Sequence, residues 1–144
     1  MSVLDHKIAA QFLESLPLCA AMGLHIGTAQ DGDLAIILPY SKNLIGDPQT
    51  GVIHGGAVSV LLDTVCGAEV FGHPENGAPT ATIDLRIDYM RPAKVGAPIY
   101  ARAVVYQTTR NVAFVRGTAW DEDYENPVAM AAAAFTFLKK EAQT

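Results

Sequence analysis

The 144-residue sequence has few cysteines, few cationic side chains and no long uninterrupted apolar run. Its two cysteines, Cys19 and Cys66, have neither metal-site spacing nor a disulfide pattern, so we expect reduced thiols in a cytoplasmic protein. Ten Lys and Arg against 15 Asp and Glu give a net charge of −5, which argues against a nucleic-acid partner. No apolar run reaches the ~18 uncharged residues of a membrane-spanning helix, so we expect no membrane partner either.

Half of the residues are nevertheless hydrophobic. The mean hydropathy of +0.20 is high for a small soluble monomer. A chain of this length forms one domain with a substantial core, so we predict a single domain over residues 1–144. We attribute the excess apolar surface to contacts between subunits.

From Gly55 to Phe71 the sequence is apolar almost throughout, and the first acid to interrupt the run is Asp63. This pattern predicts a helix over 55–71 that is buried on most of its sides. The preceding His54 and the pair Gly55-Gly56 allow a ligand to approach the backbone, and free N–H groups at a helix start favour negative charge. An acid in apolar surroundings is costly unless it is paired or has a function. The segment therefore predicts an oxyanion site and a catalytic carboxylate.

The remaining sequence predicts a short N-terminal helix and five or six antiparallel strands. Ser2 and Asp5 have capping-box spacing and Pro17 ends the apolar repeat, which places the first helix over 3–16. The clearest strand alternates apolar and polar residues over 81–89. A curved sheet wrapped around the central helix is the simplest arrangement. The other strands are predicted at 24–30, 34–38, 99–107, 112–120 and 128–138, and the last is expected to be buried on both faces.

Gly55 and Asp63 lie too far apart on one helix to act on the same carbonyl group. Eight residues at ~1.5 Å each separate them by about 12 Å, whereas catalytic groups act within about 3 Å of the atoms they serve. A two-fold dimer with antiparallel helices would bring Gly55 of one subunit opposite Asp63 of the other. We therefore predict a shared site in a homodimer, and we expect a homotetramer built as a dimer of dimers.

The motif G-x-x-H-G-G-x-x-x-x-L-L-D, from Gly51 to Asp63, resembles the hotdog-fold acyl-CoA thioesterases of the PaaI type. The strand 81–89 and the following Met90-Arg-Pro-Ala-Lys94 are similar to the same family at the matching place. The resemblance covers about residues 24–138. It implies an α+β hotdog fold and hydrolysis of an acyl-CoA substrate to a carboxylic acid and CoA. It implies no metal, and no cofactor apart from the CoA carried by the substrate.

The resemblance also implies roles for individual residues. Asp63 would be the general base or the nucleophile, and the N–H of Gly55 would stabilise the oxyanion. His54 would help to form the oxyanion site, and the Thr82 hydroxyl would orient the attacking water. The segments 91–94 and 110–111 would contact the CoA phosphates. The implied substrate-binding residues are Gly56, Arg91, Lys94, Arg110 and Asn111.

The sequence departs from the family at a fifth catalytic position. The family often has an asparagine several residues before the histidine, where it polarises the thioester carbonyl. The nearest residue here is Asp47, and Asn43 lies further away. A charged aspartate cannot donate a hydrogen bond, so either Asp47 is protonated, or it has another role, or the polarising group is elsewhere.

Two other functions remain open at this point. A hotdog hydratase or dehydratase would pair a histidine with an acid, as His54 and the partner's Asp63 could do. A non-catalytic acyl-CoA binding module is the other alternative. Cys66 lies one turn from Asp63, but no histidine is placed to activate it, so we expect an inert thiol.

Overall fold

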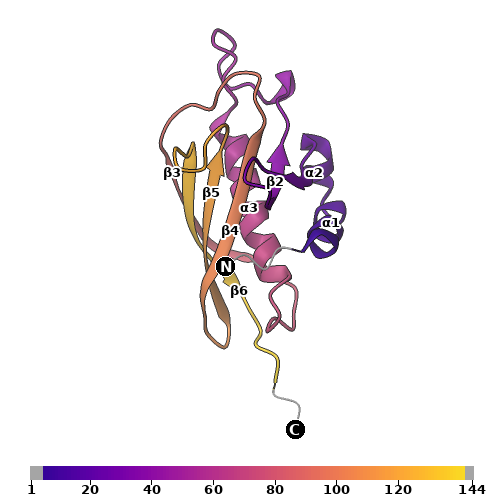
Figure 1. Cartoon of the computed structure of the whole chain (residues 1–144). Helices are drawn as coiled ribbons and strands as arrows, with labels where there is room; N and C mark the ends of the chain where they lie inside the picture. Colours follow the sequence, from indigo (N-terminus) through magenta and orange to yellow (C-terminus); the bar gives the residue numbers. More distant parts are fainter. Residues whose placement is uncertain (1–4, 142–144) are drawn as a thin grey trace.

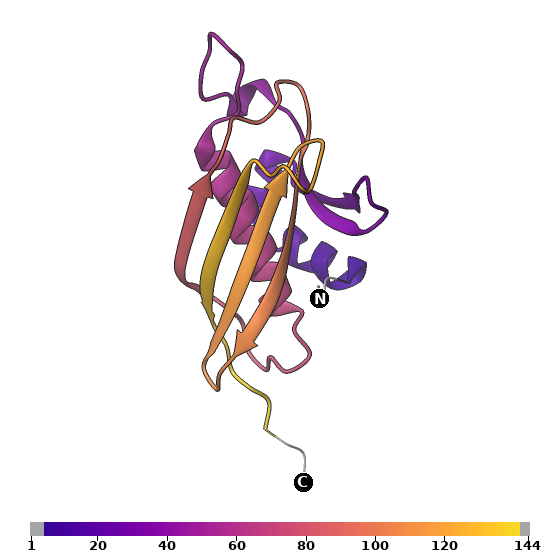
Figure 2. The same ribbon diagram turned by 60° about the vertical axis from the view of Figure 1, so that its left-hand side comes forward.

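A computed structural model describes residues 5–141 and shows one antiparallel six-stranded sheet, in the order β1-β2-β4-β5-β6-β3. The sheet packs along one side of the long helix α3, and two short N-terminal helices lie near the other side (Figures 1 and 2). This arrangement confirms the predicted α+β hotdog fold. The strands are β1 (His25–Thr28), β2 (Leu34–Leu38), β3 (Thr82–Tyr89), β4 (Ile99–Thr108), β5 (Val112–Trp120) and β6 (Ala129–Thr136), and the helices are α1 (His6–Glu14), α2 (Pro17–Met22), α3 (Gly55–Phe71) and the 3-10 turn η1 (Lys42–Leu44).

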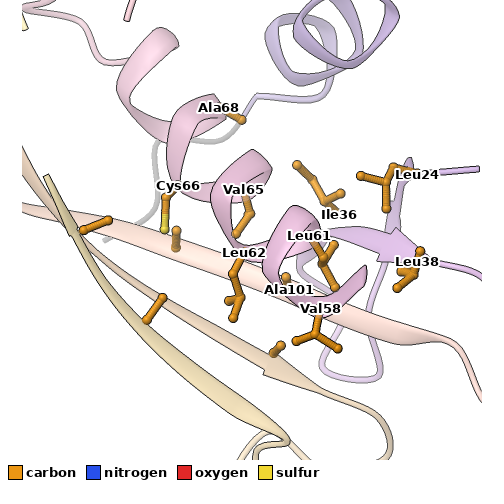
Figure 3. Close-up of a cluster of buried hydrophobic side chains, with 14 of the residues drawn as sticks. Leu24, Ile36, Leu38, Val58, Leu61, Leu62, Val65, Cys66, Ala68 and Ala101 are labelled. Atoms are coloured by element: carbon orange, nitrogen blue, oxygen red, sulfur yellow. The ribbon is translucent and has the colours of Figure 1, made fainter. Parts of the chain in front are cut away.

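Helix α3 begins and ends where the apolar pattern predicts, and it forms the centre of the core. Leu61 points toward β2 and Leu62 points toward the sheet (Figure 3). Both side chains are completely buried. The helix lies so close to β5 that a Cβ at Gly117 would approach the Cys66 sulfur to 3.0 Å. Burial of one face of the sheet against this helix accounts for its apolar sequence.

The N-terminal segment contains two helices where the sequence predicts one over 3–16. Asp5 caps α1, and its Oδ1 accepts hydrogen bonds from the N–H groups of Lys7 at 2.9 Å and Ile8 at 3.2 Å. The proposed cap Ser2 lies outside the described residues. Pro17 does not simply end a helix but begins α2, because proline needs no N–H partner in a first turn.

Strand β3 lies at one edge of the sheet and contains a bulge that the sequence pattern does not reveal. Thr82 pairs with Phe135, whereas Asp84 pairs with Ala134, so Ile83 is an extra residue. The Ile83 side chain is therefore 56% exposed, although alternation predicts that it faces the core. The bulge also reverses the direction of Thr82, which points to α3.

The prediction that the last strand is buried on both faces is wrong for the single chain. Strand β6 forms as expected, but only every second residue is buried, as at Ala131 and Ala133. Met130 and Ala132 on the opposite face are exposed. The reason is that α3 covers only one face of the sheet.

Candidate active site

The structure brings Asp63 and Thr82 together. The Thr82 hydroxyl donates a hydrogen bond of 2.7 Å to Oδ1 of Asp63, which is half-buried on α3. Oδ2 of Asp63 accepts no hydrogen bond within residues 5–141, so it is available to a water or a substrate. Thr82 therefore orients the carboxylate itself, and the bulge in β3 makes this contact possible.

The thiols near Asp63 are poor nucleophiles. Burial raises the pKa of the Cys66 thiol to about 12, and the negative charge of Asp63 adds to that effect. Burial also raises the pKa of Cys19, whose sulfur lies 3.7 Å from the Thr64 hydroxyl. Both sulfurs are thus protonated at neutral pH, in agreement with the inert thiol predicted for Cys66.

His54 caps the start of α3. Its Nδ1 accepts a hydrogen bond of 2.7 Å from the N–H of Gly56, so Nδ1 has no proton and a neutral ring carries its proton on Nε2. The backbone N–H of His54 donates to the carbonyl of Leu44 at 2.8 Å, which joins η1 to the helix start. The Gly56 N–H is therefore occupied by the cap.

The N–H of Gly55 is free at the same helix start. Among the described residues it donates no hydrogen bond, as expected for the first N–H of a helix. The Tyr89 ring lies beside it, because a Cβ at Gly55 would contact that ring at 3.4 Å. The hydroxyls of Tyr89 and Ser59 both donate to the Gly55 carbonyl, at 3.3 and 3.2 Å, and they contact each other. Gly55 thus offers an N–H donor at the end of β3 that carries Tyr89.

Asp63 and Gly55 consequently lie near opposite ends of the same strand. Asp63 contacts the first residue of β3, Thr82, and Gly55 lies against the last, Tyr89. Eight residues of helix separate the two groups by about 12 Å along the axis. One chain therefore contains both groups but does not place them at one centre.

Two hollows flank the start of α3. One has a volume of about 410 Å³ and lies on the β3 side, where Gly55, Tyr89 and Met90 form part of its wall. The other has a volume of about 280 Å³ and lies on the α2 side, where His54, Gly56 and Asn43 form part of its wall. A ligand bound at the Gly55 N–H could therefore extend in two directions.

Asp47 shapes its own loop. Its carboxylate accepts hydrogen bonds from the N–H of Gln49 at 3.0 Å and from the Thr50 hydroxyl at 2.9 Å. These two contacts lower the pKa of the Asp47 carboxyl, so the group is ionised at neutral pH. It has no proton to donate to a carbonyl. The structure thus supports a local role for Asp47, while Asn43 reaches the hollow beside His54.

Two of the predicted CoA contacts already have carboxylate partners. The Arg91 guanidinium binds Asp121 through two hydrogen bonds, at 2.8 and 2.6 Å, and it holds the pKa of the Asp121 carboxyl well below its usual range. Lys94 forms an ion pair with Glu122. Within this chain, acids therefore neutralise the charges of Arg91 and Lys94.

The Arg91–Asp121 pair predicts a large effect on stability. Asp121 is almost completely buried, so Arg91→Ala would leave a buried carboxylate without its cation. We expect the free energy of unfolding to fall by about 3–5 kcal/mol, measured by urea denaturation. Lys94→Ala is the matched control, since its exposed pair should contribute less than about 1 kcal/mol. Equal losses in the two variants would contradict this assignment.

Arg110 and Asn111 lie at the tip of the β4–β5 hairpin, at the opposite end of α3 from Gly55 (Figure 1). Arg110 lines a hollow of about 560 Å³ together with Lys139 and Lys140. In the described part of the chain, none of these three cations forms an ion pair. The sequence analysis does not predict the two lysines as binding residues, although two adjacent lysines directly after the last strand could have indicated them.

Comparison with known proteins identifies the family. Residues 50–127 match the model of the thioesterase superfamily. A Pseudomonas aeruginosa protein of known structure is 39% identical, with a TM-score of 0.79, covering 92% of this chain and 98% of that one. A Bacillus halodurans protein crystallised with CoA has a TM-score of 0.73 at 22% identity, covering 94% of each chain. The medium/long-chain acyl-CoA thioesterase YigI of Salmonella typhimurium is 23% identical over 91% of this chain and 90% of its own length.

The chain therefore belongs to the thioesterase superfamily and is a thioester hydrolase of the hotdog fold, as the motif around His54 predicts. Among residues 5–141, no helix combines the length and the apolar character needed to cross a membrane. The same residues contain no group of three His, Cys, Asp or Glu side chains suited to a metal ion.

Proposed function

We propose that this protein hydrolyses an acyl-CoA thioester to a carboxylic acid and CoA at a site shared by two subunits. The observation that carries the proposal is the position of the two groups along β3: Asp63 contacts Thr82 at its start, and Gly55 lies against Tyr89 at its end. The acyl-CoA thioesterase YigI and the CoA-containing structure from Bacillus halodurans support acyl-CoA as the substrate.

The open edge of β3 supports the homodimer. Among the described residues, β3 pairs with β6 alone, and its other edge is unpaired. Such an edge is normally protected or paired, and this one carries exposed apolar side chains at Ile83 and Tyr89. In the proposed dimer, β3 pairs antiparallel with β3 of a second copy, and the two-fold axis passes near the middle of the strand. The Thr82 end of one subunit then lies beside the Tyr89 end of the other. Asp63 then faces Gly55 of the partner subunit, twice in each dimer.

The second pairing, from dimer to tetramer, would use another surface. The face of β6 that carries Met130 and Ala132 is exposed, and it is a natural place for a second dimer to pack. This face supports the dimer of dimers that the apolar composition predicts.

Hydrolysis follows from the groups at such a site. The thioester carbonyl oxygen accepts a hydrogen bond from the Gly55 N–H, which stabilises the negative charge of the tetrahedral intermediate. Oδ2 of Asp63 removes a proton from a water molecule while the oxygen of that water bonds to the carbonyl carbon. The C–S bond then breaks, and the CoA thiolate takes up the proton held by Asp63, which restores the carboxylate. Thr82 keeps the carboxylate in place through Oδ1.

His54 has a positioning role in this scheme. Its Nδ1 lone pair accepts the Gly56 N–H, so it is not available to remove a proton from a substrate. This contact disfavours the hydratase alternative, which needs a histidine base. The ring, which lies at the edge of the hollow, keeps one donor, its Nε2–H.

Asn43 is the group we assign to the role that Asp47 cannot fill. A neutral carboxamide donates hydrogen bonds, whereas the ionised Asp47 carboxylate only accepts them. Asn43 lines the hollow that His54 and Gly56 also line, and the Leu44 carbonyl beside it is bonded to the His54 N–H. These contacts support Asn43 as a donor on the loop that adjoins the oxyanion site.

The CoA phosphates require cations, and the cluster of Arg110, Lys139 and Lys140 fits that requirement. Four of the ten Lys and Arg side chains form ion pairs within the described chain, and three of the remaining six gather around this one hollow. The hollow lies at the end of β3 that contacts Asp63. Thr136, which is close in sequence to the residues of the hollow, forms hydrogen bonds with Thr80 and Ala81, and these two residues directly precede Thr82. The phosphates would therefore bind the subunit that supplies Asp63.

A panel of acyl-CoAs tests the proposed reaction, with release of free thiol as the measurement. Thiol release supports hydrolysis. Hydration of an enoyl-CoA without thiol release would instead identify a hydratase, and tight binding without any turnover would identify a binding module.

Size-exclusion chromatography with light scattering tests the homodimer, and a monomer with full activity would contradict the shared site.

The cation cluster gives a prediction about substrate affinity. Replacing Arg110 or Lys139 with alanine should raise KM for acyl-CoA on the order of tenfold, the value of one charged hydrogen bond. KM for the matching acyl-pantetheine should not change, because that thioester has no nucleotide phosphates. Lys7→Ala, an exposed lysine on α1, is the control. Equal effects on both substrates would contradict phosphate binding at this cluster.

A further inference from the structure

We infer that the hollow between α2, η1 and the start of α3 receives the acyl group, and that Met22 and Val60 set its length limit. This inference rests on the proposed acyl-CoA hydrolysis. The hollow has a volume of about 280 Å³ and opens beside the oxyanion site. Its apolar wall consists of Met22, Leu44, Ile45, Ala57 and Val60.

The start of α3 has two functional sides. Gly55, Ser59 and Asp63 follow one another at intervals of four and face β3, through the contacts with Tyr89 and Thr82. The residues that follow each of these, Gly56, Val60 and Thr64, face α2. Gly56 and Val60 line the hollow, and Thr64 contacts Cys19 of α2. The α2 side therefore adjoins the oxyanion N–H but lies away from the strand edge that meets the partner.

The two substituents of a thioester carbonyl point in different directions, and each needs its own space. The CoA arm then extends across the β3 edge, because the cations Arg110, Lys139 and Lys140 lie at the Asp63 end of the subunit beyond it and form no ion pair within residues 5–141. The acyl group must then turn to the other side of Gly55, toward α2. The hollow beside His54 is the space available there.

The chemistry of the lining indicates which acyl groups fit. The described residues that line the hollow include no Asp, Glu, Lys or Arg, and the Nδ1 of the His54 ring at its edge is occupied by the Gly56 N–H. The apolar side chains are aliphatic or, in Met22, a flexible thioether that adapts to irregular ligands. An unsubstituted aliphatic acyl chain satisfies this surface, whereas an acyl group ending in a carboxylate would lose its hydration without gaining a partner.

Met22 and Val60 lie on different elements at this hollow. Met22 is the last residue of α2, where Gly23 adopts a left-handed conformation with φ of 75° and turns the chain toward β1. Val60 projects from α3 on the same side as Gly56. A smaller side chain at Met22 and a larger one at Val60 should therefore have opposite effects on the length of the preferred acyl chain.

The test is to measure kcat/KM for straight-chain substrates from acetyl-CoA to palmitoyl-CoA with the full-length protein. In Met22→Ala the preferred chain should become longer, and in Val60→Phe it should become shorter. Because one methylene in an apolar pocket changes selectivity by about 10–200-fold, each variant should change the long-to-short ratio of kcat/KM by at least about tenfold. Leu18→Ala is the matched control, since Leu18 is on α2 but is 56% exposed.

The ratio within one variant does not depend on how much of the protein is folded, because misfolded protein lowers all rates equally. If both variants keep the wild-type profile while hydrolysing acyl-CoA, the inference is overturned and the proposed function stands. If only the control changes the profile, the inference is likewise overturned. If the wild type releases no thiol from any acyl-CoA, the proposed function and the inference both fail.

Discussion

Asp63→Asn is expected to lower kcat for acyl-CoA hydrolysis by about 10²–10⁴-fold, the usual contribution of a general base. The asparagine keeps the size of the side chain, and its carbonyl oxygen can still accept the 2.7 Å hydrogen bond from Thr82. What it loses is the basic oxygen that removes the proton from water. Folding and KM should therefore change little, which thermal unfolding and initial-rate kinetics will measure.

Asp33→Asn is the control for the loss of one negative charge. Asp33 is exposed in the turn between β1 and β2, at the opposite edge of the sheet from β3, so removal of its charge should leave kcat unchanged. A variant Asp63→Asn that retains more than a tenth of wild-type kcat would rule out Asp63 as the base. A single turnover in ¹⁸O-labelled water then tests the role more closely, because label found in the Asp63 carboxyl would show direct attack through an anhydride.

Gly55→Pro should lower kcat by about 10²–10³-fold, the effect of losing one oxyanion donor. Proline removes the N–H, yet it is well tolerated at the first position of a helix. The preceding His54, with ψ of 134°, already has the extended conformation that a residue before proline requires. The native N–H forms no hydrogen bond within residues 5–141, so the substitution should affect the reaction more than the fold.

Gly55→Ala is the matched control for this substitution. Alanine keeps the N–H, and its Cβ would meet the Tyr89 ring at an ordinary contact distance of 3.4 Å. This variant should retain kcat within a few-fold of the wild type. If the alanine and proline variants lose the same activity, the glycine is required for space and the N–H is not the oxyanion donor.

The two inactive variants together test whether the site is shared. In a mixed dimer of Asp63→Asn and Gly55→Pro, both defects fall in one of the two sites and the other site is intact. Random exchange of equal amounts should therefore restore roughly a quarter of wild-type activity, since half of the dimers are mixed and each has one working site. Subunit exchange is confirmed separately with differently tagged copies. Exchange without recovery would show that Gly55 and Asp63 do not act across a subunit interface.

The central helix and its cap could be predicted because their signals are local. A long, mostly apolar run that follows His54-Gly55-Gly56 specifies where α3 begins and which residues occupy its exposed start. Strands β4 and β5 are equally apparent from alternating residues around a polar turn. The Asp63–Thr82 contact is different, because strict alternation would point Thr82 away from the helix, and only the bulge at Ile83 reverses it.

The cationic residues show why charge near a motif is a weak guide to a binding site. Arg91 and Lys94 stand in the segment that the family resemblance assigns to CoA, but Asp121 and Glu122 neutralise them from a turn about thirty residues later. Lys139 joins Arg110 only because β6 runs beside β5, where the Lys139 N–H bonds the Arg110 carbonyl at 3.1 Å. An ion pair or a cluster between distant segments depends on their meeting in space.

Local chemistry was thus sufficient for the fold class, the position of α3 and the residue types at its start, because helix formation and capping depend on neighbours within a few positions. Folding of the whole chain settled which side chains remain free to act. It engaged the Asp47 carboxylate in its own loop, paired Arg91 with Asp121, and left the edge of β3 open. Those outcomes depend on contacts between residues far apart in the chain, and no pattern of neighbouring residues encodes them.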